Sequence, residues 1–299
     1  MFDLVRTLDC AGRPLRLDRP RIAGIVNVTP DSFSDGGKFA NAQQAIDHAL
    51  RLVEEGADII DVGGESTRPG ADEISAGEEI ARVVPVIEGL AARISIPIAI
   101  DTSKPEVMRA AVAAGAGLIN DVYALRRDGA LDAAADAKVP VCLMHMQGEP
   151  RTMQDDPRYD DVVSDVRRFL AERIFACEMS GIDKKRIVVD PGFGFGKTLE
   201  HNLALLRALD QFAALGVALL VGLSRKGMIG ALTGRDVEQR AAGSAAAAML
   251  AVQKGAAIVR VHDVSATRDV LAVWQAVASD GVPARKADKP FGSQRFEDD

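Results

Sequence analysis

The stretch RIVVDPGFGFGK, residues 186–197, joins a short apolar run to a polar, glycine-rich segment, and this pattern decides the fold. Similar apolar runs occur at residues 22–28, 58–62, 96–101, 118–121, 140–146, 217–223 and 257–262. Stretches with helical spacing lie between them. Continuous apolar strands that alternate with amphipathic helices indicate a parallel sheet that is covered on both faces or closed into a barrel. Eight such units favour a single parallel (β/α)8 TIM barrel over a doubly wound sheet, and a barrel of about 250 residues fits the chain.

The two ends of the chain differ from the barrel pattern. Leu4–Leu8 and Leu15–Leu17 flank a turn-like segment and predict an N-terminal hairpin, at about residues 1–20, that plugs the barrel floor. Residues 283–299 are polar and aperiodic, which predicts a flexible tail. We therefore expect one barrel domain over residues 1–282.

Composition excludes several classes of protein. Asp and Glu number 43 against 36 Lys and Arg, a net charge of −7, which argues against a general nucleic-acid binder. Cys10, Cys142 and Cys177 are widely spaced and form no CxxC pair, which argues against a structural zinc site. An odd, sparse set of cysteines suits a reducing compartment. The longest uncharged run, residues 211–224, is shorter than the about 20 residues of a membrane span. We expect a cytoplasmic enzyme without a signal peptide, membrane partner or nucleic-acid partner.

Polar residues stand at the carboxyl ends of the predicted strands. Alternate residues of a strand share a face, so polar tips above aliphatic residues predict a pocket with an aliphatic floor. The polar tips are Asn27, Asp101, Asn120, Asp190, Arg260 and His262. A buried charge is costly unless it is paired or meets a ligand, so these residues are candidates for a binding site.

Each polar tip has a structural alternative, because it could begin a turn or cap a helix. That alternative is strongest for Asp101, which precedes a helix start at Thr102–Pro105 and lies where the strand alternation could break. It is weakest for Arg260, because an arginine inside an apolar strand caps nothing. For Asp61 and Asp121 the structural interpretation is preferred.

Two loops and one strand add to the pocket. Residues 190–197 match neither a P-loop nor a dinucleotide fingerprint, and their glycines predict a flat slot beside Asp190. Residues 224–227 follow the seventh strand and open a helix, whose N–H groups would attract an anion. Alternation places Met144 on the pocket face, where a thioether suits a flat ring, and turns His145 away from it.

In chain order, eight segments resemble the dihydropteroate synthases, the pterin-binding barrel family of folate biosynthesis. They are IVNVTPDSFS (25–34), DVGGESTRPG (61–70), IDT (100–102), IND (119–121), MHMQG (144–148), DPGFGFGK (190–197), SRK (224–226) and VRVHD (259–263). The resemblance spans roughly residues 20 to 280 and touches every predicted strand. No motif position departs from the family pattern.

The resemblance implies a transferase that joins 7,8-dihydropterin-6-ylmethyl pyrophosphate to p-aminobenzoate and releases pyrophosphate, with Mg2+ as cofactor. For the pterin it implies Asp101, Asn120, Met144, Asp190 and Lys226. For pyrophosphate it implies Thr67, Arg68, Arg260 and His262, and for the metal Asn27. For p-aminobenzoate it implies Phe33, Pro69, Phe195 and Ser224. The implied catalytic residues are Asp101, Lys226, Arg260 and His262.

The resemblance also suggests a homodimer through outer helices, with the alanine-rich residues 241–249 close to the interface. The loops at 29–38 and 63–72 are expected to assemble the second-substrate site when ligands bind. The sequence leaves two other functions open. A barrel methyltransferase for methyl-tetrahydrofolate would share the pterin-binding carboxylates but would not need Arg260 and His262. A pterin-binding protein without catalysis is the second alternative, and complete loops argue against it.

Overall fold

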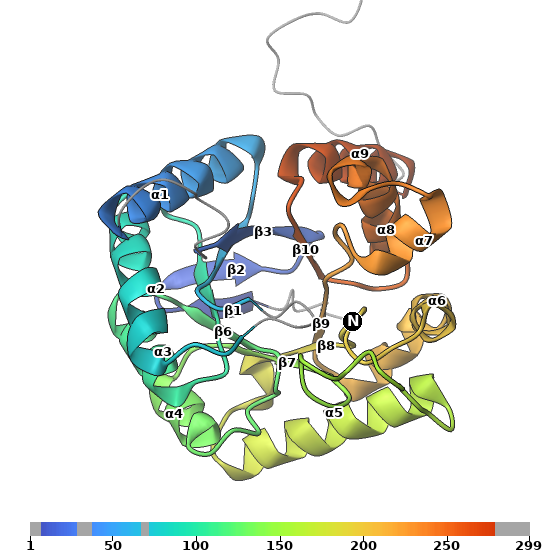
Figure 1. The fold of residues 1–299 in the computed structure, drawn as a ribbon, viewed down its shortest axis with the longest axis horizontal. Helices are drawn as coiled ribbons and strands as arrows, with labels where there is room; N and C mark the ends of the chain where they lie inside the picture. The colour runs from blue at the N-terminus through green and yellow to red at the C-terminus, as the bar shows by residue number, and fades with distance from the viewer. Residues whose placement is uncertain (1–6, 29–37, 67–71, 279–299) are drawn as a thin grey trace, which may run out of the picture.

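The computed structural model describes residues 7–28, 38–66 and 72–278, except for the side chains of residues 38–40. In this part of the chain, eight parallel strands close into a barrel in the order β10-β3-β4-β5-β6-β7-β8-β9 (Figure 1). The strands are β3 (Arg21–Asn27), β4 (Ile59–Gly63), β5 (Ile98–Asp101), β6 (Leu118–Asp121), β7 (Val141–Met144), β8 (Ile187–Asp190), β9 (Ala218–Val221) and β10 (Ile258–Val261). All coincide with predicted apolar runs, so the TIM-barrel prediction is confirmed.

Helices surround the barrel (Figure 1). They are α1 (Lys38–Glu55), α2 (Ala76–Ala91), α3 (Pro105–Ala113), α4 (Ala130–Ala137), α5 (Val162–Met179), α6 (Leu199–Arg207), α7 (Gly227–Thr233), α8 (Ala241–Gln253) and α9 (Val264–Ala278). Short 3-10 turns are η2 (Lys184–Arg186), η3 (Leu209–Leu215) and η4 (Val237–Gln239). Side-chain caps fix helix starts: the Ser75 hydroxyl accepts from the Glu78 amide at 3.2 Å, ahead of α2. Within the described residues, no helix combines the length and apolarity needed to cross a bilayer.

The strands divide their side chains between two apolar layers. Ile60 of β4 and Ile100 of β5 belong to the large cluster between the barrel and its helices. Their neighbours Ile59 and Ala99 belong to a second cluster, which fills the barrel interior. Strict alternation therefore separates an outer face from an inner face, as the pleat of a strand requires.

The alternation continues to the last residue of β5. Asp101 remains in the ladder, with Gly63 and Asn120 as its register partners on either side. It therefore shares the inner face with Ala99, and the break in alternation that the sequence allowed at this position does not occur. Asp101 faces the barrel interior because the pairing on both sides preserves the pleat.

An antiparallel hairpin closes the floor of the barrel. Its strands are β1 (Thr7–Cys10) and β2 (Arg13–Arg16). Leu8, Cys10 and Leu15 join the inner cluster of the barrel. Gly117 permits the close approach, because a Cβ there would lie 2.3 Å from the Cys10 carbonyl oxygen. The predicted plug is confirmed, whereas the predicted tail at 283–299 lies outside the described residues.

Candidate active site

Polar side chains from several strands meet at the carboxyl end of the barrel. Asn27 ends β3, Asp101 ends β5 and Asp190 ends β8, while Asn120 lies in β6 and Arg260 in β10. All of them occupy inner-face positions above the aliphatic cluster of the barrel interior. The sequence prediction of a polar ring above an aliphatic floor is therefore confirmed for these residues.

Arg260 is held by two carboxylates. Its Nε donates to Asp61 Oδ2, and its Nη2 donates to Asp101 Oδ2 at 2.6 Å. Burial alone would lower the pKa of Arg260, but the two carboxylates raise it, so the guanidinium stays charged. These bonds use two of the five N–H donors of an arginine. The other donors suit an anion at the barrel mouth.

Asp61 is the residue that sequence reasoning missed. Its Oδ1 is buried and has no hydrogen-bond partner among the described residues. A structural interpretation was preferred for Asp61, and its contact with the Arg260 guanidinium brings the carboxylate into the candidate site. Counting alternate positions from Ile59, an inner-face residue of the same strand, would have found it.

Asp101 lies in a crowded electrostatic environment. Burial raises the pKa of Asp101 to about 7, against the opposing effect of the Arg260 guanidinium, and the Asp61 carboxylate adds to the rise. A single guanidinium cannot fully offset the negative charges of two neighbouring carboxylates. The Asp101 side chain can therefore change its charge near neutral pH.

His262 follows β10 and is fixed by Ser224. The Ser224 hydroxyl oxygen accepts from the His262 backbone amide at 3.1 Å and lies 3.0 Å from His262 Nδ1. Burial lowers the pKa of His262 to about 3, and the Arg260 guanidinium lowers it further. A neutral ring that accepts a hydrogen bond from the Ser224 hydroxyl at Nδ1 carries its own proton on Nε2, which is then a hydrogen-bond donor.

Asp190 is buried at the end of β8 and oriented by its own turn. Its Oδ1 accepts from the Gly192 amide at 2.8 Å. Burial raises the pKa of Asp190, and the Gly192 hydrogen bond and the Lys226 ammonium oppose the rise. Gly222 leaves room beside the second oxygen, because a Cβ there would lie 3.9 Å from Asp190 Oδ2.

Lys226 and Phe195 close one side of this carboxylate. The Lys226 Nζ lies 4.0 Å from the centroid of the Phe195 ring, which is within the range of a cation–π contact. Burial lowers the pKa of Lys226 to about 8, Arg260 lowers it further, and Asp190 opposes. Lys226 is the N-cap residue of α7. The helix therefore begins within residues 224–227, as the sequence predicts.

An apolar platform lies beside the polar ring. Met144 belongs to a small cluster that includes Val122, Met146, Met153 and Phe195. This cluster is separate from both main layers of the barrel. Thioether and aromatic groups of this kind suit a flat heteroaromatic ring.

Three further predictions concern neighbouring residues. Asp121 is structural, as preferred, because its carboxylate accepts from the Tyr123 and Leu125 amides at 2.8 and 2.7 Å. His145 turns away from the interior, also as predicted, and its Nδ1 lies 2.9 Å from Lys197 Nζ. The predicted site residues outside the described part of the chain are Phe33, Thr67, Arg68 and Pro69.

Comparison with known proteins identifies the family. The family model described as "Pterin binding enzyme" matches residues 23–262. Dihydropteroate synthase of Escherichia coli (strain K12) is 52% identical over 268 residues, 90% of this chain and 95% of the relative. The Xanthomonas albilineans dihydropteroate synthase with 4-aminobenzoic acid is 62% identical, with a TM-score of 0.88 over 92% of this chain and 99% of the other. The same organism's enzyme in complex with 7,8-dihydropteroate has 59% identity and a TM-score of 0.84, over 91% and 99% of the chains. The chain belongs to the dihydropteroate synthases, transferases of the pterin-binding enzyme family.

Proposed function

We propose that the barrel mouth joins 7,8-dihydropterin-6-ylmethyl pyrophosphate to p-aminobenzoate and releases pyrophosphate. One observation carries the residue assignments: a buried carboxylate, Asp190, and a partly buried guanidinium, Arg260, face the same end of the barrel. The first suits the N–H donors of a pterin and the second suits a phosphate. Similar enzymes with 4-aminobenzoic acid and with 7,8-dihydropteroate support this choice of substrate and product.

The pterin is assigned to Asp190 and its neighbours. The pterin edge offers an amidine-like row of N–H donors, which a carboxylate can accept bidentately. Asn120 can donate and accept on another edge, and Met144 supplies an apolar surface for the ring. Lys226 and Asp101 complete the site, because a protonated amine and a carboxylate can meet the remaining acceptors and donors of the ring.

The leaving pyrophosphate is assigned to Arg260 and His262. Arg260 retains N–H donors beyond those that bind Asp61 and Asp101, and the neutral His262 donates from Nε2. Both groups are fixed before an anion arrives, so they need little reorganisation to stabilise the departing charge. Thr67 and Arg68 are assigned to the same anion from the family pattern.

Mg2+ is assigned to Asn27, whose amide oxygen suits a hard cation that keeps most of its waters. The surroundings fit, because Gly63 leaves space between Asn27 and Asp101: a Cβ there would lie 3.7 Å from Asn27 Oδ1. When bound, Mg2+ would neutralise part of the pyrophosphate charge.

The reaction breaks the bond between the pterin methylene carbon and the pyrophosphate oxygen, and the electron pair leaves with pyrophosphate. Arg260 and His262 stabilise that charge, while ionised Asp101 stabilises the positive charge that develops on the pterin. The amine nitrogen of p-aminobenzoate then bonds to the methylene carbon and loses a proton to water. Positioning is the main requirement for this nucleophile. Phe195, Ser224, Phe33 and Pro69 are assigned to hold it.

A homodimer and a cytoplasmic location complete the proposal. Leu250 of α8 and Val273 and Val277 of α9 are large apolar side chains exposed on neighbouring outer helices, which supports a contact with a second copy. The three cysteines are free and buried, as suits a reducing compartment. Light scattering coupled to size-exclusion chromatography measures the mass of the protein in solution. The mass of a monomer at micromolar protein concentration would overturn the proposed dimer.

Asp190→Asn tests the pterin assignment. The substitution keeps the shape of the side chain but replaces acceptors with a donor that faces the pterin N–H groups. Buried mismatches of this kind cost about 1–3 kcal/mol, or more when a charge is involved. Calorimetric titration with the dihydropterin pyrophosphate should show that loss of binding free energy, and unchanged affinity would overturn the assignment.

A further inference from the structure

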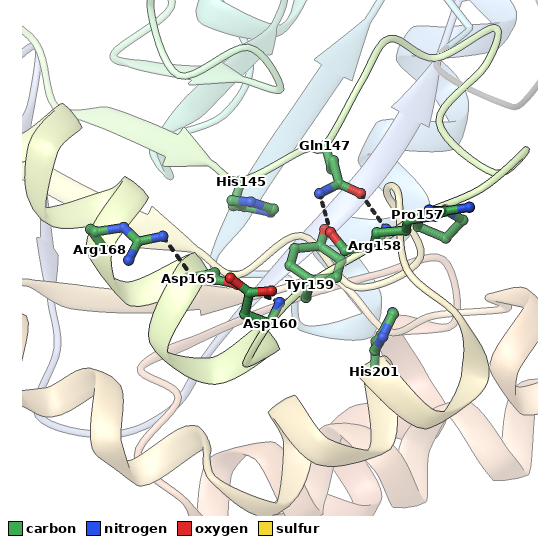
Figure 2. Close-up of a pocket in the computed structure, with 9 residues that line it drawn as sticks. All are labelled: His145, Gln147, Pro157, Arg158, Tyr159, Asp160, Asp165, Arg168 and His201. Atoms are coloured by element: carbon green, nitrogen blue, oxygen red, sulfur yellow. Dashed lines mark hydrogen bonds and ion pairs between the residues drawn. The ribbon is translucent and has the colours of Figure 1, made fainter.

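A polar cavity of about 660 Å³ lies outside the barrel mouth, beside the loop that follows Asp190. Figure 2 shows His145 and Tyr159 on its wall, with Gln147 and Arg158 joined by hydrogen bonds at its rim. His145 is buried, and its ring contacts the buried Lys197. Polar contacts therefore run from the cavity through His145, Lys197 and Gly192 to Asp190 of the active site.

Lys197 is almost fully buried. Burial lowers the pKa of its side chain to about 7, against the opposing effect of the Asp190 carboxylate, and its Nζ is surrounded by acceptors. The Nζ lies 2.8 Å from the Gly192 carbonyl oxygen, 3.0 Å from the Phe195 carbonyl oxygen and 2.9 Å from His145 Nδ1. An ammonium has three N–H donors, and these three contacts can use all of them. Burial lowers the pKa of His145 to about 2, and Lys197 lowers it further, so the ring is neutral and accepts at Nδ1.

The acceptors of Lys197 belong to the loop that shapes the active site. The amide of Gly192 donates to Asp190 Oδ1, so the same glycine contacts Lys197 on one side and Asp190 on the other. Phe195, the other carbonyl partner, presents its ring to the Lys226 ammonium. Gly192 has a φ of +70°, and a Cβ there would lie 1.9 Å from the His145 carbonyl oxygen. The loop is thus held tightly against His145 and Lys197.

We propose that Lys197 and His145 are positioning residues, which hold the 191–196 loop so that Asp190 and Phe195 are aligned for the pterin. The proposal rests on the proposed role of Asp190. Both residues act on the pterin through the loop and not by direct contact. Lys197 acts through Gly192 and Phe195, and His145 acts by orienting the Lys197 ammonium. Tyr159 supports the same loop from the cavity side, because its hydroxyl donates to the Gly196 carbonyl at 2.6 Å.

The test compares matched variants by calorimetric binding of the dihydropterin alcohol that lacks phosphates. Lys197→Met keeps the length of the side chain and removes every donor, so the Kd should rise at least about tenfold, as for the loss of hydrogen bonds to a charged group. The control is Lys185→Met. It changes an exposed lysine of η2, ahead of β8, and should leave the Kd unchanged. His145→Leu should weaken binding, whereas His145→Asn should retain it, because its amide oxygen can replace Nδ1 as the acceptor.

Thermal unfolding of each variant separates positioning from a purely structural role. A variant with a lower Tm but a wild-type Kd in its folded fraction would overturn the proposal. If Lys197→Met fails to fold, equal Kd values for His145→Leu and His145→Asn would overturn it. Asp190→Asn is measured alongside. Weaker binding by Asp190→Asn with unchanged binding by Lys197→Met would refute the positioning role alone. Unchanged binding by Asp190→Asn would refute the pterin assignment and the positioning role with it.

Discussion

Arg260 donates to Asp101 across the barrel mouth, with 2.6 Å between Nη2 and Oδ2. The contact joins the end of β5 to β10, and a second carboxylate, Asp61 of β4, binds the Nε of the same guanidinium. An arginine fixed by two carboxylates has little freedom left to lose when an anion binds. The pair also places a positive charge for pyrophosphate next to a negative charge for the developing pterin cation.

Arg260→Met should weaken the binding of pyrophosphate far more than that of a pterin without phosphates. The substitution removes the charge-assisted donors and leaves Asp61 and Asp101 facing each other. Loss of hydrogen bonds to a charged group costs about 1.5–3 kcal/mol. Calorimetry with each ligand measures the two losses, and equal losses would mean that Arg260 has a structural role.

The pH dependence of kcat/KM should report Lys226. Its pKa is lowered by burial to about 8, so it is charged below that pH and loses its charge as the pH rises through it. If the ammonium binds the pterin, kcat/KM should fall above about pH 8. In Lys226→Arg the group stays charged, so activity should be lower but this alkaline limb should be absent. Identical limbs in the two enzymes would refute the role.

Lys104 should be important for stability. Its ammonium lies 2.7 Å from Glu79 Oε2 and 2.9 Å from Glu65 Oε2, and Glu79 is fully buried. Lys104→Met would leave a buried carboxylate without its cation, a change that costs about 3–5 kcal/mol. Urea unfolding gives the free energy of unfolding. Lys254→Met removes a long surface ion pair, with 3.7 Å to Asp210 Oδ1, and is the matched control. Similar losses in the two variants would contradict this prediction.

p-Aminobenzoate should bind measurably only after the other ligands. A pterin cation exposed to solvent would react with water, so the chemistry favours a second site that forms when the first is filled. Calorimetric titration with p-aminobenzoate is compared in the free enzyme and in the presence of a pterin-site ligand, pyrophosphate and Mg2+. Comparable affinity in the two states would mean a preformed site.

Strand alternation predicted much of the site because it is a local property. The inner-face positions of Asn120, Asp190 and Arg260 follow from counting along short apolar runs, and the ladder preserves that count. The closed barrel followed from the number of strand–helix units. The floor plug followed from two apolar runs around one turn.

The contacts between strands could not be predicted in the same way. Arg260 binds the carboxylates of Asp61 and Asp101, which lie 199 and 159 residues earlier in the chain. No local sequence pattern predicts which carboxylate an arginine will bind. The contact between His145 and Lys197 spans 52 residues, and alternation indicated only that His145 turns away from the barrel interior.

The most direct test of the account is the release of pyrophosphate from 7,8-dihydropterin-6-ylmethyl pyrophosphate in the presence of Mg2+, measured with and without p-aminobenzoate. We expect release that depends on p-aminobenzoate, with 7,8-dihydropteroate formed in equal amount. A methyltransferase or a non-catalytic pterin-binding protein would give no such release. No release, or release at the same rate without p-aminobenzoate, would contradict the proposed reaction.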